Sequence, residues 1–267
     1  MTAVELYHAV WYTGCVTLRP STLERVGGYW SRSLGCDRDA LSRTGPTVVP
    51  GRTGRDEVRL LACDDATVVV SPSERLSEVR RTVEAAEGRD APELVAAFDP
   101  PPGRVRGPQF VGYADRSTIR TAPDDGIRVL TREDADALAR LRAACGRREW
   151  STRVGGFSFD AHTTLLGRFI DGRLVAVAAH GEDDPVAGIG VVVRPDHRRG
   201  GHGTAVVVAS ARDALENGLV PEYRAHESWT ASVGLARAAG FRRYGTYAAF
   251  DLDRADHGPG IGLRSTG

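Results

Sequence analysis

An apolar segment that runs directly into a glycine-rich loop constrains the fold of this 267-residue chain more than any other feature. Val186–Val193 is apolar throughout its length, which predicts a buried strand, and the loop Arg194–Gly203 follows it at once. A helix is expected from the end of this loop to about Asn217, where Gly218 stops it. A buried strand, a short loop and a helix in this order are typical of an α/β fold.

The same loop combines glycines with arginines at the point where the helix begins. The first helical turn leaves its N–H groups unpaired and carries the positive end of the helix dipole. Glycines let the backbone approach a ligand, and Arg198 and Arg199 carry forked donors that suit phosphate oxygens. The segment Arg198–Thr204 therefore predicts a pyrophosphate site. It lacks the lysine of a Walker A loop and the spacing of the dinucleotide fingerprint, and a glycine-rich turn without a ligand is the alternative.

Composition excludes several classes of function. The 35 basic residues are all arginine, which rules out a lysine Schiff base, and 35 acidic residues balance them, so no basic field attracts nucleic acid. The cysteines form no C-x-x-C pair and no histidine stands at metal-ligand spacing, so we expect free thiols and no metal. We see no signal peptide and no membrane-spanning run, which predicts a cytoplasmic protein. The four cysteines are Cys15, Cys36, Cys63 and Cys145.

The first part of the chain, residues 1–125, predicts a smaller α/β domain. Serine caps, glycine stops and alternating apolar residues indicate helices and one hairpin. Three consecutive prolines at 100–102 then interrupt regular structure before a short strand. The helices are expected at 21–34, 73–88 and 91–98, the hairpin strands at Val58–Ala62 and Thr67–Ser71, and the short strand at Gln109–Ala114.

A domain boundary is expected near residue 125, because residues 115–126 are polar and contain proline and glycine. The second domain, 126–253, alternates strands with helices, and residues 254–267 are expected to form a flexible tail. Strands are expected at 127–130, 163–170, 174–180, 186–193, 223–227 and 241–252, and helices at 131–145, in the segment ending near 217, and at 228–239.

Three features of this second domain occur in a recognisable order. The loop reads Arg198-x-x-Gly201-x-Gly203, a proline follows the preceding strand, and Gly240-Phe241 opens the last strand after a helix. In these motifs the chain resembles the GCN5-related N-acetyltransferase (GNAT) superfamily, whose loop is Arg/Gln-x-x-Gly-x-Gly/Ala. The resemblance covers residues 127–252 and extends to a subgroup with an additional N-terminal α/β module.

This resemblance implies a GNAT-like α/β fold, a twisted mixed sheet flanked by helices, with acetyl-CoA bound as co-substrate between two central strands. The amides of Val191 and Val193 would pair with the pantetheine arm, and the loop would hold the pyrophosphate. The residues implied in CoA binding are Val191, Val192, Val193, Arg198, Arg199, Gly200, Gly201, His202, Gly203, Thr204, Trp229 and Ser232.

Three positions depart from the family pattern. Trp229 replaces an asparagine that contacts CoA, and it is expected to stack on the adenine, to line the acceptor pocket or to pack in the core. Ala236 replaces a tyrosine acid, and Ala187 replaces a strand carboxylate, so the resemblance does not assign the general acid or base. The catalytic candidates are Glu227, His180 and Glu149, with Tyr244 and Tyr247 as further acids; a surface or capping carboxylate is the alternative for Glu227.

The leading hypothesis is an acyl-CoA-dependent N-acyltransferase that moves an acetyl group to a primary amine of a small molecule by direct attack in a ternary complex. The alternative is a non-catalytic acyl-CoA-binding sensor or structural partner with the same fold. We expect a small-molecule amine as partner and neither nucleic acid nor membrane, with a homodimer as one option. The N-terminal module is expected to cover the acceptor site, to form a dimer surface, or to be a degenerate copy of the same fold.

Overall fold

The computed structural model describes residues 18–51, 57–86, 90–100, 104–146, 150, 159, 163–183 and 185–252. Contacts between residues divide the chain into two compact units. The larger unit combines residues up to 29 with residues 110–244, and the smaller unit combines residues 30–109 with those from 245 onward. Both units mix strands with helices, so the predicted α/β class is confirmed.

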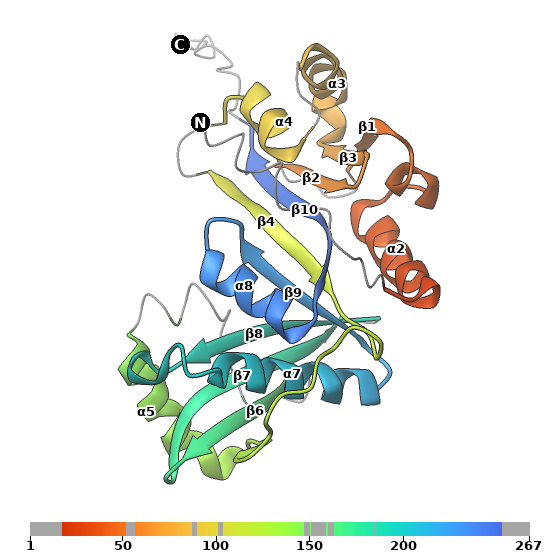
Figure 1. Ribbon diagram of the computed structural model, residues 1–267. Coiled ribbons are helices and arrows are strands. Elements are labelled where there is room, and N and C mark those ends of the chain that lie inside the picture. Colours follow the sequence, from red (N-terminus) through yellow and green to blue (C-terminus); the bar gives the residue numbers. More distant parts are fainter. Residues whose placement is uncertain are drawn as a thin grey trace, which may run out of the picture. The chain divides into compact units, whose positions relative to one another are not determined.

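The sheet of the larger unit contains both antiparallel and parallel strand pairs (Figure 1). Its strand order is β10-β4-β9-β8-β7-β6-β5. The neighbours from β5 to β8 are antiparallel, whereas β8 and β9 run parallel and are joined by a helix, α7, as a parallel pair requires. The strands are β4 (Val105–Tyr113), β5 (Ile127–Val129), β6 (Thr163–Ile170), β7 (Arg173–Asp183), β8 (Val186–Val193), β9 (Val220–His226) and β10 (Arg242–Asp251).

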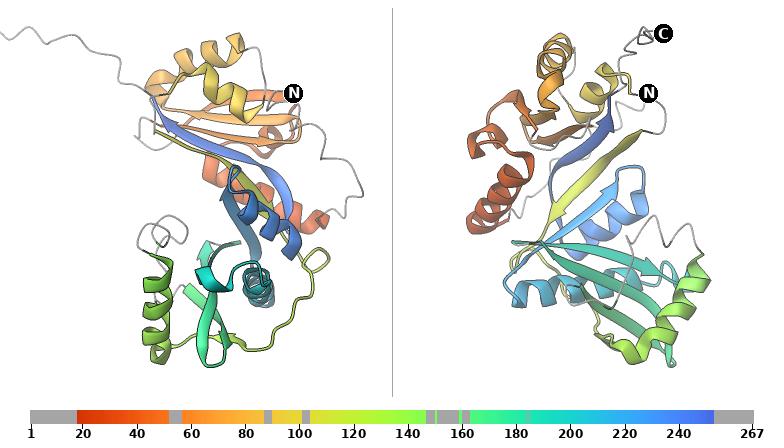
Figure 2. Two further views of the ribbon diagram at one scale, coloured as in Figure 1. Left: turned by 60° about the vertical axis from the view of Figure 1, so that its left-hand side comes forward. Right: turned by 180° about the vertical axis from the view of Figure 1, so that it is seen from behind.

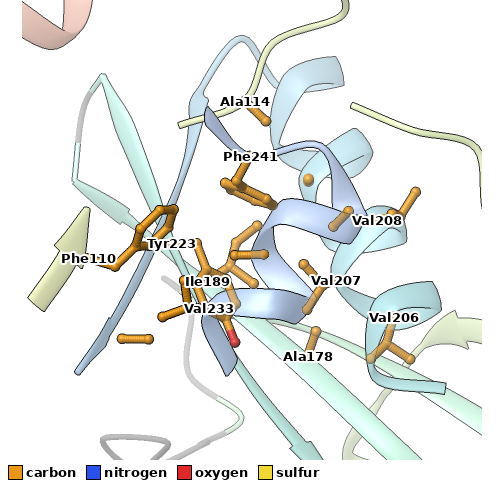
Figure 3. Packing of buried hydrophobic residues seen from close by; sticks show 14 of the residues in the cluster. Phe110, Ala114, Ala178, Ile189, Val206, Val207, Val208, Tyr223, Val233 and Phe241 are labelled. Atoms are coloured by element: carbon orange, nitrogen blue, oxygen red, sulfur yellow. The ribbon is translucent and has the colours of Figure 1, made fainter. Parts of the chain in front are cut away.

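Helices cover both faces of this sheet. In Figure 2, α5 (Ala135–Cys145) lies on one side of β6 and β7, and α7 (His202–Glu216) lies on the other. The helix α8 (Thr230–Ala239) shares the α7 side, where Figure 3 shows Val207, Val233 and Phe241 packed together. The α5 side has its own apolar cluster, which includes Leu141 and Val177.

Alternating side chains of β8 belong to these two faces. Ile189, Val191 and Val193 pack against the cluster under α7 and α8, whereas Val192 belongs to the cluster under α5. Because side chains alternate along a strand, Gly188 and Gly190 also face the α5 side. The α5 face of β8 therefore lacks side chains at these two positions.

The smaller unit has a sheet of order β1-β3-β2-β10-β4, with the remaining parts of β4 and β10 at one end. The predicted hairpin is confirmed, since β2 and β3 pair antiparallel around a turn at Asp64. Its core contains Leu60, Val69 and Phe250. The other elements are β1 (Gly45–Pro50), β2 (Glu57–Cys63), β3 (Ala66–Ser71), α3 (Leu76–Ala85) and α4 (Ala91–Ala97).

The two units do not follow the boundary expected near residue 125. The strand β4 precedes that boundary but lies between β9 and β10 in the sheet, and Phe110 is fully buried in the core of the larger unit. The helix α2 (Pro20–Leu34) also contributes its first ten residues to the larger unit. Loop composition alone does not reveal such long-range pairing, because it depends on partners far away in the chain.

Several element bounds differ from those expected. The strand β4 has nine residues instead of six, and β7 ends at Asp183 instead of residue 180. The helix α8 begins at Thr230 with Trp229 at its N-cap, so Ser228 is not its cap. The strands expected at 163–170 and 174–180 are joined by a hairpin turn at Asp171-Gly172, with φ of 49° and 73° at its two central residues.

Phe110 provides a test of this division. Phe110→Ala should lower the free energy of unfolding by about 3–5 kcal/mol, because it removes a fully buried ring from the core under α7 and α8. Chemical denaturation measures the loss, and hydrogen exchange should show faster opening of α8. The half-buried neighbour Gln109→Ala is the control. An unchanged α8 in the Phe110 variant would mean that β4 does not belong to the larger unit.

Candidate functional site

The parallel strands β8 and β9 separate shortly after they begin. Their pairing is Val186 with Val220, Ala187 with Pro221 and Gly188 with Glu222, and it stops there. The strand β8 continues to Val193 and β9 continues to His226, so the two strands part beyond Gly188 and Glu222. We call this last pair the vertex and the space beyond it the gap.

The backbone of β8 offers hydrogen-bonding groups to the gap. The N–H of Arg194 donates to the carbonyl of Val175 on β7, on the side away from β9. Because N–H groups alternate in direction along a strand, the N–H groups of Val191 and Val193 point toward the gap. An extended ligand can bind such an edge as an additional strand.

The loop after β8 delivers the chain to the N-terminus of α7. The segment Pro195–His197 forms one turn of 3-10 helix, and Gly201 caps α7 with a φ of 78°, a left-handed conformation that favours glycine. No side chain caps this end, and no acidic residue stands in the first turn. The amides of the first turn and the helix dipole therefore suit an anion.

Close packing also requires glycine inside this turn. A Cβ on Gly203 would lie 2.8 Å from Cδ1 of Leu235 and 3.0 Å from Cγ2 of Val193. Both distances are shorter than side-chain contacts tolerate without movement, so α7, α8 and β8 meet around Gly203. The start of α7 is thereby held beside the end of β8.

Basic side chains surround this helix end. The Nε of Arg198 donates to the carbonyl of Val193 at 3.2 Å, while Arg199 is exposed. Burial, and then the charge of Arg168, lowers the pKa of the His202 imidazole. Its buried Nδ1 has no hydrogen-bond partner among the described residues. Arg168 is a basic residue of β6 that the sequence did not single out, because β6 is distant from the loop in the chain.

The start of α8 holds the remaining residues implied in CoA binding. The Trp229 ring lies 6.1 Å from the ring of His226, measured between centroids. The Ser232 hydroxyl is 2.9 Å from the Tyr223 hydroxyl, which belongs to the core shown in Figure 3. Ser232 thus contacts the sheet from within α8.

Glu227 lies on the α8 side of the sheet and is held by an arginine. Both of its carboxylate oxygens accept hydrogen bonds from Arg243, at 2.5 and 2.8 Å. The Arg243 guanidinium in turn lies 4.9 Å from the centroid of the Phe110 ring. A base role for Glu227 would have to compete with this bidentate ion pair.

His180 lies beneath α7 and is almost fully buried. Its Nδ1 is 3.0 Å from the Ser210 hydroxyl and its Nε2 is 3.3 Å from the Asp213 carboxylate. Both partners belong to α7, so the ring connects β7 to that helix. Neither ring nitrogen is left for a reacting group at the vertex in this arrangement.

The other catalytic candidates are Glu149, Tyr244 and Tyr247. Glu149 lies outside the described residues, while the neighbouring Trp150 is buried in the cluster under α5. Tyr244 packs edge-on against Tyr113 at 5.5 Å in the larger unit. Tyr247 belongs to the smaller unit, where it packs on Trp30.

A buried polar network at the vertex was not expected from the sequence. The Tyr113 hydroxyl donates to Oε1 of Glu222 at 2.5 Å, and the Arg224 guanidinium binds both oxygens of the same carboxylate at 2.8 and 2.9 Å. The signal was present: Glu222 and Arg224 are two charges, two residues apart, inside a short buried strand. That spacing places both on the α5 face, because Tyr223 between them packs in the opposite core.

Tyr29 of α2 extends this network. Its hydroxyl donates to Oδ2 of Asp183 at 3.0 Å and accepts from Nη2 of Arg224 at 3.5 Å. Burial, with the charge of Glu222, raises the pKa of Tyr29 to about 12 and that of Tyr113 well above its usual value. Both phenols therefore stay protonated and act as donors.

The two cavities found among the described residues lie away from the vertex. A shallow cavity of about 370 Å³ lies where β5 and β6 meet Phe159, and another of about 290 Å³ lies along the outer side of α7. Among these residues, no group of three or more His, Cys, Asp and Glu side chains could hold a metal ion. None of their helices has the length and apolar character needed to cross a bilayer.

Comparison with known proteins identifies the segment that contains the gap. Residues 130–241 match the model of the acetyltransferase (GNAT) family. This segment is similar to the acetyltransferase domain of the GNAT family. It contains β8, the loop, α7, β9 and α8, whereas β4, α2 and all of β10 lie outside the matched residues. No curated protein matches the chain.

Solved structures of GNAT proteins resemble this chain at low identity. One from Novosphingobium aromaticivorans is 24% identical, covering 57% of this chain and 67% of its own, with a TM-score of 0.45. An acetyltransferase of Colwellia psychrerythraea is 15% identical, covering 68% and 75%, with a TM-score of 0.50. A GCN5-related N-acetyltransferase-like protein of Streptococcus suis is 17% identical, covering 86% and 97%, with a TM-score of 0.46. The likeness at these identities concerns the fold.

The ion pair of Glu227 gives a testable distinction between a structural and a catalytic carboxylate. Glu227→Gln should lower the free energy of unfolding by about 1–3 kcal/mol, because it leaves Arg243 with a weakened partner. The double variant with Arg243→Gln should lose less than the sum of the two single losses, as measured by denaturation. Glu216→Gln, an exposed change, is the control. A variant of full stability with no acetyl transfer would instead make Glu227 catalytic.

Proposed function

We propose that this protein transfers an acetyl group from acetyl-CoA to a primary amine of a small molecule by direct attack. The observation that carries the proposal is the parting of β8 and β9 beside an uncapped helix N-terminus. A pantetheine arm needs an open strand edge, and a pyrophosphate needs unpaired amides. The open edge of β8 and the unpaired amides of α7 lie beside each other at the gap.

The residues present fit CoA. The amides of Val191 and Val193 would hold the pantetheine arm, and the first turn of α7 would bind the pyrophosphate with help from Arg198 and Arg199. Acetyl-CoA supplies an activated thioester. The remaining residues that we assign to this site are Val192, Gly200, Gly201, His202, Gly203, Thr204, Trp229 and Ser232.

The reaction requires a neutral amine at the thioester carbon. The nitrogen forms a bond to the carbonyl carbon and loses a proton, the C–S bond breaks, and the leaving thiolate takes up a proton. The structure supports approach of the amine from the α5 face. On the opposite face, Ala187 and Ile189 of β8 pack against α7 and leave that side covered. Roles of Glu227, His180 and Glu149 in the proton transfers stay predictions. The contacts of Glu227 and His180 favour a structural role for these two residues.

Openness at the vertex favours an enzyme over a non-catalytic CoA-binding protein. Gly188 is exposed, and a Cβ at that position would meet nothing within 4 Å. A binding protein that had lost catalysis would gain stability by filling this space. We place the enzyme in the cytoplasm, where the free thiols of Cys36, Cys63 and Cys145 would persist.

Thermal shift with acetyl-CoA and free CoA tests the proposed function. Ligand at about 100 times its dissociation constant should stabilise the protein by about 2.7 kcal/mol. Release of free thiol from acetyl-CoA, screened over small primary amines, then measures transfer. The absence of a shift with either ligand would contradict CoA binding, and a shift without thiol release from any amine would contradict the transferase.

Two matched glycines test where the phosphates bind. Gly201 and Gly218 stand at opposite ends of α7 with φ of 78° and 77°, and a Cβ on either meets nothing within 4 Å. Gly201→Glu should weaken CoA binding by at least about 100-fold, or about 2.7 kcal/mol, because it puts a negative charge at the pyrophosphate site. Gly218→Glu imposes the same backbone strain and charge and should leave affinity unchanged. Calorimetric titration measures both, and equal affinities would move the phosphates elsewhere.

A further inference from the structure

The α5 face at the vertex contains an opening formed by glycines. Gly181 of β7 pairs with Gly188 of β8, and Ala179 pairs with Gly190. Paired residues of neighbouring strands face the same side, so Gly181, Gly188 and Gly190 all face α5. We call these three residues the glycine window. Gly188 is exposed there although strands flank it on both sides.

The window lies where an acceptor has to enter if the proposed function holds. Gly188 is one half of the vertex, so the window adjoins the end of the gap in which we place the thioester. The α7 side is closed by side chains of β7 and β8, including the buried His180 and Ile189. The window is therefore the open approach to the vertex in the part of the chain that the structure describes.

Two carboxylates of the described residues border the window and differ in how their charges are compensated. Glu222 is buried at the vertex, and the Arg224 guanidinium compensates its charge. Asp183 is exposed on β7, and its recorded partner is the neutral hydroxyl of Tyr29. The nearby Arg25 guanidinium donates to the carbonyls of Gly218 and Pro185. Of these two described carboxylates, Asp183 is thus the one whose negative charge an incoming ligand meets.

Strand geometry fixes the spacing between Asp183 and the vertex. Asp183 pairs with Val186, two residues before Gly188, on the side of the vertex away from the gap. Two residues along a strand and one strand across correspond to about 8 Å between the Cα atoms of Asp183 and Gly188. A group bound at Asp183 therefore stands apart from the nitrogen that attacks the thioester.

We propose that Asp183 binds a second ammonium group of the acceptor, so that the enzyme prefers small molecules with two amines separated by a short chain. This inference rests on the proposed function. The attacking nitrogen has to be neutral, so Asp183 serves the other end of the molecule. Tyr29 is a positioning residue, because its hydroxyl orients the Asp183 carboxylate while contacting Arg224. Tyr29 comes from α2, outside the matched GNAT segment, and so the N-terminal part of the chain would set specificity.

The test compares pentane-1,5-diamine with pentylamine, which lacks the second ammonium. Thiol release from acetyl-CoA should show a KM at least about tenfold lower for the diamine, at similar kcat. Asp183→Asn should raise the diamine KM to that of pentylamine and leave the pentylamine KM unchanged. Tyr29→Phe should shift the diamine KM in the same direction by a smaller factor. Asp125→Asn, an exposed change elsewhere in the larger unit, is the control for lost charge.

The outcomes separate the two proposals. Equal KM values for the two amines, or an equal effect of Asp183→Asn on both, would overturn the role of Asp183 while acetyl transfer stands. A CoA-induced thermal shift without thiol release from either amine or any other would overturn the transferase, and the acceptor site with it. Thermal melting of each variant shows whether a raised KM reflects lost folding.

Discussion

The pairing of β8 with β9 is the constraint on which the rest of this site depends. Three residue pairs hold the strands together and then the pairing stops at Gly188 and Glu222. Strand edges in a protein interior are normally paired, because unpaired N–H and C=O groups lose hydrogen bonds to water. A gap of this kind is stable only where the neighbouring elements hold both strands independently.

Each strand does have its own support. The strand β8 remains paired with β7 along its whole length, and Gly203 lets α7 and α8 pack closely against its end. On β9, the buried Glu222 forms an ion pair with the partly buried Arg224, and Tyr113 of β4 donates a hydrogen bond to the same carboxylate. A buried ion pair gains little net stability because its charges lose hydration, so its value here is in fixing geometry. It holds β9 in place where its partner strand leaves it.

The sequence predicts the order of the elements around the loop, but it does not reveal which distant residues pack beside them. The order of β8, the loop and α7 follows from local signals: an apolar run, glycines and the helix that starts after them. Tyr113, Arg168 and Tyr29 reach the site through pairing and packing between distant segments, which local patterns do not encode. The expected boundary near residue 125 differs from the observed units for the same reason, because a polar connection separates β4 in sequence from the strands beside which it lies.

Candidate catalysts illustrate the same limit. Glu227 and His180 were singled out by residue type and by their positions at strand ends. Their partners, Arg243 and the Ser210–Asp213 pair, come from elements whose faces the sequence did not place against them. By contrast, Glu222 precedes the strand expected at 223–227, and its role at the vertex follows from the direction in which it faces on β9. Side-chain direction at the vertex therefore matters more than residue type in deciding which groups lie together there.

Amide hydrogen exchange with and without CoA tests the central claim most directly. If the pantetheine arm pairs with β8 and the pyrophosphate binds at α7, exchange should slow at Val191 and Val193 and in the first turn of α7, from His202 to Thr204. Amides of β2 and β3 in the smaller unit should change much less. Binding of CoA without any protection between residues 189 and 204 would contradict the account, because the gap would then not be its site.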